Sequence, residues 1–215
     1  MAHEIDEVIQ TRLSVARLAS YMNMAGADLS NALDLYIWNS RVAAAFLVLL
    51  GDVEVVIRNA WHEQLMRLST SLNGSEFWFD NQFGLLRENS LQHIADANQR
   101  LLRQQRQPVA NQIVAELNFG FWRFLVAKQY RTTLWPLAGK YAFPNIDPAE
   151  IQRLSAAMGR LHDLRNRIAH HEPIHMRDLE KDLADCLWVI GAVCITTRGW
   201  VEKHSRVAEV LGERP

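Results

Sequence analysis

Residues 43–68 read AAAFLVLLGDVEVVIRNAWHEQLMRL, and this stretch decides the fold class. Its apolar residues recur three or four positions apart, which is the spacing of one face of an α-helix: Ala43, Leu47, Leu50, Ile57, Trp61, Leu65 and Leu68. The pattern predicts one long helix from about Asp28 to Leu72, with a bend at Gly51. The most apolar run, Val42 to Leu50, is shorter than the ~20 residues of a membrane-spanning helix, so we expect it in a protein core.

Outward from this stretch the helical period continues, and no run alternates long enough to predict a strand. Six or seven helices are predicted, over residues 5–22, 28–72, 85–106, 119–135, 147–171 and 176–210, with a further one opening at Pro108. Loops are expected at 73–84 and 135–147. Asp147, Pro148 and Glu150 fit an N-cap, a first-turn proline and a capping box. The chain is therefore expected to be one all-α domain over residues 1–215.

Composition limits the classes of function. The chain has 215 residues, of which 49% are hydrophobic and 22% charged, with a net charge of −1. This balance excludes a strongly basic nucleic-acid-binding protein but leaves room for a local basic site. Two cysteines, Cys186 and Cys194, exclude a disulfide scaffold, and residues 1–7 lack the pattern of a signal peptide. A cytoplasmic protein with no membrane association is expected.

Residues 161–175 (LHDLRNRIAHHEPIH) contain the main candidates for ligand binding and proton transfer. Arg165 takes a place in the apolar stripe of its helix, Asn166 and His170 lie four apart, and His171 follows. The end of a helix favours a protonated histidine. Such a set suits an anionic ligand such as a phosphodiester, which arginine can clamp while histidine moves a proton. On spacing alone, an arginine–carboxylate pair with histidines capping the helix is the more common arrangement.

A second polar feature interrupts the long helix. Glu54 falls within its apolar stripe, and Arg58 follows four residues later. They form either a buried ion pair, which is the commoner arrangement, or a polar platform facing the histidine-bearing helix. In both cases the two helices are expected to meet.

A zinc site is the main alternative that the sequence argues against. Residues 171–175 spell the HExxH pattern of zinc proteases, which needs two histidines one turn apart on a continuous helix. Pro173 stands between them and breaks such a helix. No metal or other cofactor is therefore expected.

The same residues carry a family resemblance. Arg165 and Asn166 followed by His170 are similar to the R-x4-H signature of HEPN domains. Residues 165–174 (RNRIAHHEPI) resemble, more narrowly, the bacterial Abi-like (abortive infection) family. Three other stretches agree with it in order: residues 36–39 (YIWN), 53–59 (VEVVIRN) and 117–122 (LNFGFW). The resemblance is strongest over residues 28–174.

The resemblance implies a HEPN-type helical bundle with additional helices and a role in phage defence or as a toxin. It implies a metal-independent endoribonuclease that acts as a homodimer and uses the ribose 2′-hydroxyl at a composite cleft. Arg165 would hold the scissile phosphate, His170 would move the proton and Asn166 would orient one of them. Glu54, Arg58 and Asn59 would support the site, and His171 is an alternate acid or base.

Some HEPN toxins are silenced through a tyrosine two residues after the motif histidine, where this chain has Glu172. A different antitoxin or a non-coding RNA would then be the inhibitor. Two rival interpretations stay open: a non-catalytic RNA-binding module that keeps the motif for phosphate contact, and a structural helical domain whose polar residues are buried pairs.

Overall fold

The computed structural model describes residues 2–215, and in this part of the chain every regular element is helical. The α-helices are α1 (Ala2–Leu13), α2 (Val15–Met24), α3 (Leu29–Asn73), α4 (Glu88–Arg103), α5 (Ala110–Glu116), α6 (Phe119–Leu125), α7 (Lys140–Ala142), α8 (Ile151–Ala169), α9 (Leu179–Val193), α10 (Ile195–His204) and α11 (Val207–Gly212). Short helical turns are η1 (Trp78–Asp80), η2 (Lys128–Tyr130), η3 (Trp135–Gly139) and η4 (Pro148–Glu150). The predicted all-α class is confirmed.

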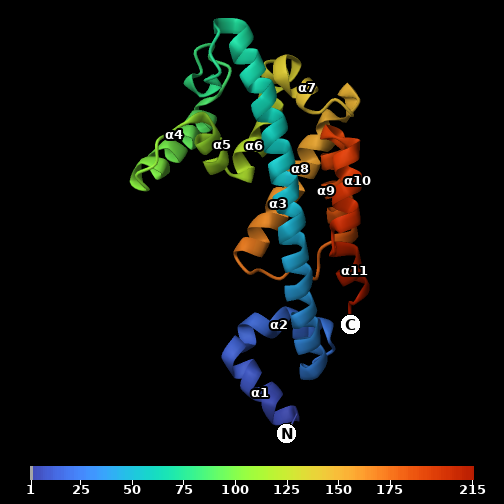
Figure 1. Ribbon diagram of the computed structural model, residues 1–215. Coiled ribbons are helices and arrows are strands. Elements are labelled where there is room, and N and C mark those ends of the chain that lie inside the picture. The colour runs from blue at the N-terminus through green and yellow to red at the C-terminus, as the bar shows by residue number, and fades with distance from the viewer. Residues whose placement is uncertain (1) are drawn as a thin grey trace.

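Helix α3 is the axis of the molecule, and the long helix predicted here is confirmed (Figure 1). It begins where the Asp28 side chain accepts a hydrogen bond from the Asn31 N–H at 2.9 Å. It ends at Gly74, whose positive φ of 74° forms a left-handed cap. The chain stays helical through Gly51, because the buried residues around it hold that turn against the core.

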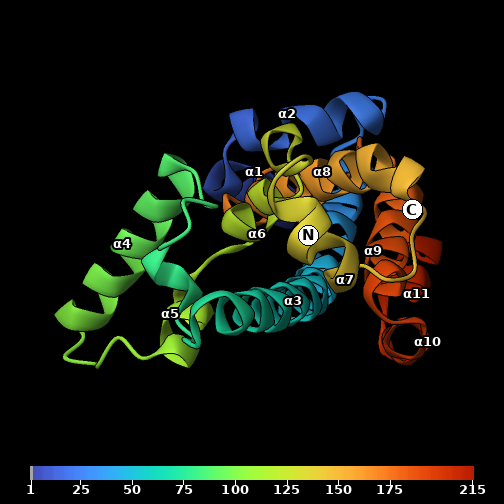
Figure 2. The same cartoon turned by 90° about the horizontal axis from the view of Figure 1, so that it is seen from above.

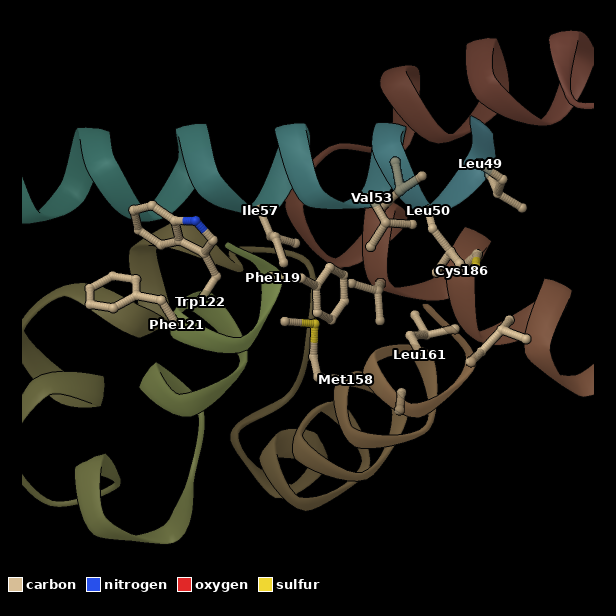
Figure 3. Packing of buried hydrophobic residues seen from close by; sticks show 14 of the residues in the cluster. Leu49, Leu50, Val53, Ile57, Phe119, Phe121, Trp122, Met158, Leu161 and Cys186 are labelled. Carbon is tan, nitrogen blue, oxygen red and sulfur yellow. The ribbon is translucent and has the colours of Figure 1, made fainter. Parts of the chain in front are cut away.

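Other helices surround α3 and bury one continuous hydrophobic core. Helix α3 contacts α2, α6, α8, α9 and α11. Figure 3 shows the centre of the core, where Val53 and Ile57 of α3, Phe119 of α6, Met158 of α8 and Cys186 of α9 lie together. Helices α4 and α5 pack on each other and project from this body (Figures 1 and 2).

The structure corrects two predicted helices. The segment 5–22 is two helices, because Ser14 has a positive φ of 77° and its hydroxyl starts α2 by accepting a hydrogen bond from the Arg17 N–H. The segment 176–210 is three helices, because Cys194 is extended, with φ −154°, and the chain turns again at Ser205.

The segment 119–147 also differs from the prediction. Helix α6 ends at Leu125, and the expected loop 135–147 starts with the helical turns η3 and α7. Beyond this end, Tyr130 is fully buried and its hydroxyl accepts a hydrogen bond from the Arg87 N–H at 2.9 Å, which ties the segment after α6 to the base of α4.

Among residues 2–215, no helix combines the length and the apolar character needed to cross a membrane.

Candidate functional site

Helix α8 begins at the predicted capping box, which the structure confirms in η4. The Asp147 side chain accepts from the Ala149 N–H at 2.8 Å, and the Glu150 side chain accepts from the Asp147 N–H at 3.3 Å. Leu164 is fully buried, whereas Arg165 is half-buried beside it, so the predicted place of Arg165 within the apolar stripe is wrong by one residue. One residue is a turn of about 100° around the helix, which moves Arg165 to the edge of the buried face.

Glu54 of α3 reaches the same edge. Burial raises the pKa of Glu54, while the charges of Arg165 and Arg58 and a hydrogen bond from the backbone of Phe119 lower it. No described residue, Arg58 and Arg165 included, forms an ion pair with Glu54 within 4.0 Å. The close Glu54–Arg58 pair that the sequence allowed is therefore absent, and Glu54 lies where α3, α6 and α8 meet.

His162 is another half-buried polar group of α8. Its ring stacks on Phe119, with centroids 6.1 Å apart and planes inclined by 25°. Asn166 Nδ2 lies 3.4 Å from His162 Nδ1, one helical turn away. Burial lowers the pKa of His162, and so do the charges of Arg123 and Arg165, while Asp163 opposes them. The side chain is 23% exposed, which leaves its ring open to a ligand.

Two glycines admit these side chains between α6 and α8. A Cβ atom on Gly120 of α6 would lie 3.2 Å from His162 Nε2, and one on Gly159 of α8 would lie 3.6 Å from Arg123 Nη2. Arg123 also lies over the Phe124 ring, 5.3 Å from its centroid. Within residues 2–215 Arg123 has no ion-pair partner closer than 4.0 Å, and the same holds for Arg165.

We call these groups the polar cluster: Glu54, Arg58, Arg123, His162, Arg165 and Asn166. The charges of its arginines lower the pKa of Glu54 and of His162, with Arg165 contributing to both. The half-buried carboxylate of Glu54 is the main negative charge opposing them. Positive charge therefore exceeds negative charge at this place, in a site of reduced dielectric. Such a site favours an anion, and arginine favours phosphate oxygens.

His62 continues the polar edge of α3 one turn beyond Arg58. Its Nδ1 accepts a hydrogen bond from Trp78 Nε1 at 3.0 Å. Burial and the charge of Arg58 lower its pKa. This contact joins the aromatic loop after α3 to the edge that carries Glu54.

The other predicted site residues lie apart from these contacts. His170 is the exposed C-cap of α8, which ends at Ala169, two residues before its predicted end. His171 is exposed with a positive φ of 56°, and its carbonyl accepts a hydrogen bond from Arg17 Nη2. Asn59 is exposed on α3, its Oδ1 3.5 Å from Arg58 Nε. Within residues 2–215, no hydrogen bond, ion pair or ring contact joins His170 to Arg165.

The HExxH segment does not form a helix. His171 is exposed, whereas His175 is 1% exposed and packs against Tyr21 of α2, with ring centroids 4.4 Å apart and planes inclined by 30°. The backbone between them is a turn, because the left-handed His171 and Pro173 end the helix. The two imidazoles therefore belong to different surroundings.

Sequence reasoning missed His162 and Arg123. His162 stands four residues before Asn166, and this spacing was a usable signal. Arg123 had none, because only the packing of α6 on α8 brings it there. Comparisons with protein-family models, with curated proteins and with solved structures found no match to this chain.

Proposed function

We propose that this protein is a metal-independent endoribonuclease of the HEPN type, which acts in phage defence or as a toxin. It would work in the cytoplasm and cut RNA through the ribose 2′-hydroxyl at a cleft between two copies of the chain. The observation that carries this proposal is the half-buried Arg165, which lies beside His162 and Asn166 with no ion-pair partner within 4.0 Å among the described residues.

An unpaired arginine at a half-buried place favours a ligand over a structural role. A structural arginine in such a place is normally paired, because an unpaired charge is costly to desolvate. Arg160 and Arg177, which are half-buried, follow that rule, as Arg177 Nε lies 2.8 Å from Asp182 Oδ2, whereas the half-buried Arg131 has no ion pair within 4.0 Å among the described residues. Arg165 has no ion pair among the described residues and interacts with the charge of Glu54 at longer range. A bound phosphodiester would supply the missing anion.

The separation between Arg165 and His170 along the chain supports a dimer. Arg165 and His170 are five residues apart, which on an ideal helix separates them by about 140° around the axis and about 7.5 Å along it. One copy cannot easily direct both side chains at one phosphate. A two-fold pair of copies can, with an isologous interface.

In this proposal Arg165 holds the scissile phosphate, His170 moves a proton and Asn166 orients the neighbouring groups. The carboxylate of Glu54 attracts both Arg165 and Arg58, and Asn59 lies beside Arg58. His171 is the alternate proton-transfer group. An antitoxin protein or a non-coding RNA would restrain the activity in the cell.

A non-catalytic RNA-binding module is the second candidate, and one observation favours it. His170 is exposed, and within residues 2–215 no side chain holds its ring by a hydrogen bond. A histidine left free in this way contacts a phosphate as readily as it moves a proton. In this case the polar cluster would bind RNA without cutting it.

Total bacterial RNA incubated with the purified protein in EDTA tests the proposal. Cutting by the wild type that is lost in His170→Ala, with fragments ending in 2′,3′-cyclic phosphate, is the expected result. If the protein binds RNA but does not cut it, with or without added metal, the RNA-binding module is the better account and the nuclease proposal fails.

A further inference from the structure

We infer that His162 takes the proton from the ribose 2′-hydroxyl in the RNA cleavage proposed above. This inference rests on the proposed function and adds a residue that the R-x4-H motif does not contain. The carrying observation is its position: the ring of His162 lies against Phe119, Asn166 and Gly120, within reach of the charges of Arg123 and Arg165.

The ring of His162 is oriented in advance. Phe119 stacks on one face, Asn166 Nδ2 lies 3.4 Å from Nδ1 and 3.5 Å from Nε2, and Gly120 stands beside Nε2, where a Cβ would lie 3.2 Å away. A proton-transfer group works best when neighbouring groups hold its ring in the required geometry. His170 has no comparable contacts among the described residues.

The charges around His162 suit a base. Burial and the charges of Arg123 and Arg165 lower its pKa, so the ring is neutral at neutral pH and can accept a proton. Asp163 opposes this effect, but its side chain is 69% exposed and screened by water. The same two arginines attract the phosphate, so they bring the substrate to the base that they keep neutral.

The cleavage reaction needs one group that accepts a proton and one that donates a proton, and the two histidines take these two roles. The 2′-oxygen gives its proton to His162 and forms a bond to phosphorus, and the bond from phosphorus to the 5′-oxygen breaks. The 5′-oxygen takes a proton from the imidazolium of His170, and the products are a 2′,3′-cyclic phosphate and a 5′-hydroxyl. No metal, oxidant or further reactant enters this balance.

His170 must come from the other copy. His162 and His170 of one chain are eight residues apart, which is about 12 Å along a helix axis. This span is too long for one phosphate. The site therefore combines His162 and Arg165 of one copy with His170 of the second copy.

Cleavage of a labelled RNA in EDTA, measured across pH, tests the inference with four proteins: wild type, His162→Gln, Arg123→Gln and His204→Ala. His204 is an exposed histidine of α10 outside the polar cluster and serves as the matched control. We expect His162→Gln to lose about 100-fold or more in rate, which is the usual contribution of a general base. His204→Ala keeps the wild-type rate. Thermal unfolding of each variant separates loss of rate from loss of fold.

Arg123→Gln gives a readout that a merely structural role of His162 would not move. Removing the Arg123 charge raises the pKa of His162, so the acidic limb of the pH–rate profile is expected at higher pH than in the wild type. Two results would overturn this inference but not the proposed function, provided that the wild type cuts RNA. One is a wild-type rate in His162→Gln, and the other is an acidic limb of the pH–rate profile that does not move in Arg123→Gln. A folded wild-type protein that never cuts RNA would overturn it together with the proposed function.

Discussion

The side-chain oxygen of Asn39 lies 3.0 Å from the backbone nitrogen of His175 and accepts a hydrogen bond from it. The same oxygen accepts a second hydrogen bond from the Ile174 N–H at 2.9 Å. Asn39 is buried on α3, and both partners belong to the turn that follows α8. One side chain of the central helix therefore fixes the path of the chain just after His170.

Asn39→Ala is expected to destabilise the protein. The change leaves two backbone N–H groups buried without an acceptor, and each such group costs roughly 1–3 kcal/mol. Urea unfolding measures the free energy of unfolding. Ser40→Ala, at the exposed neighbouring position, is the control and should change it by less than about 0.5 kcal/mol. Equal stability of the Asn39 variant and the wild type would show that this contact does not hold the turn.

Stability should fall as the pH falls from 7 to 5. Burial lowers the pKa of His175 below the usual 6.5, and the charge of Arg214 acts in the same direction. The unfolded chain then binds more protons than the folded one below about pH 6.5, so the free energy of unfolding decreases there. The same sign holds for His62 and His162, and these three histidines together outweigh Glu54, whose raised pKa acts in the opposite direction.

His175→Phe isolates one of these contributions. Neither ring nitrogen of His175 makes a hydrogen bond of good geometry among the described residues, and the ring packs on Tyr21. A phenyl ring keeps that packing and has no proton to gain. We expect a shallower loss of stability between pH 7 and 5, measured by urea unfolding at each pH. An unchanged slope would show that His175 does not contribute to it.

Glycine substitutions separate the site from the scaffold. Gly120→Ala brings a Cβ to 3.2 Å from His162 Nε2, so it should displace the ring and lower the rate of RNA cleavage. Gly51→Ala meets nothing within 4 Å in the middle of α3. That change should raise the free energy of unfolding by about 0.5–1 kcal/mol, because alanine favours a helix more than glycine does. Full cleavage activity in Gly120→Ala would contradict the role given to His162.

Mixed dimers test whether two copies build one site. Neither His162→Gln nor His170→Ala should cut RNA alone. When the two are refolded together in equal amounts, each mixed dimer keeps one complete site, and about a quarter of the wild-type activity should return if the site is shared across a two-fold interface. A mixture that stays inactive, although subunits exchange, would place both histidines in one copy.

The sequence predicted the helices whose signals are local. The capping box at Asp147 and the apolar period of α3 depend on neighbours along the chain, and both predictions were confirmed. The breaks at Ser14 and Cys194 were missed, because the apolar period runs on past residues whose backbone leaves the helix. After the early end of α6, Tyr130 bonds to the distant Arg87, a tertiary contact that local patterns cannot reveal.

The candidate site was predicted in part for the same reason. The spacing of Arg165 and Asn166 can be read along one helix, and the expected meeting of that helix with Glu54 of α3 is observed. Arg123 joins them from α6 through tertiary packing alone. The placement of Arg165 was wrong by one residue. The three- and four-residue spacing of an apolar stripe does not distinguish a position at the centre of a helix face from one at its edge.

The most direct test of a nuclease built around Arg165 is single-turnover cleavage of a labelled RNA in EDTA by the wild type and by Arg165→Ala. Chain ends and RNA binding are measured in the same samples. We predict 2′,3′-cyclic phosphate ends from the wild type and a rate at least about 100-fold lower in the variant, because a preorganised cationic donor to the transition state is lost. Equal cleavage by the two proteins, or none by the folded wild-type dimer, would contradict this account.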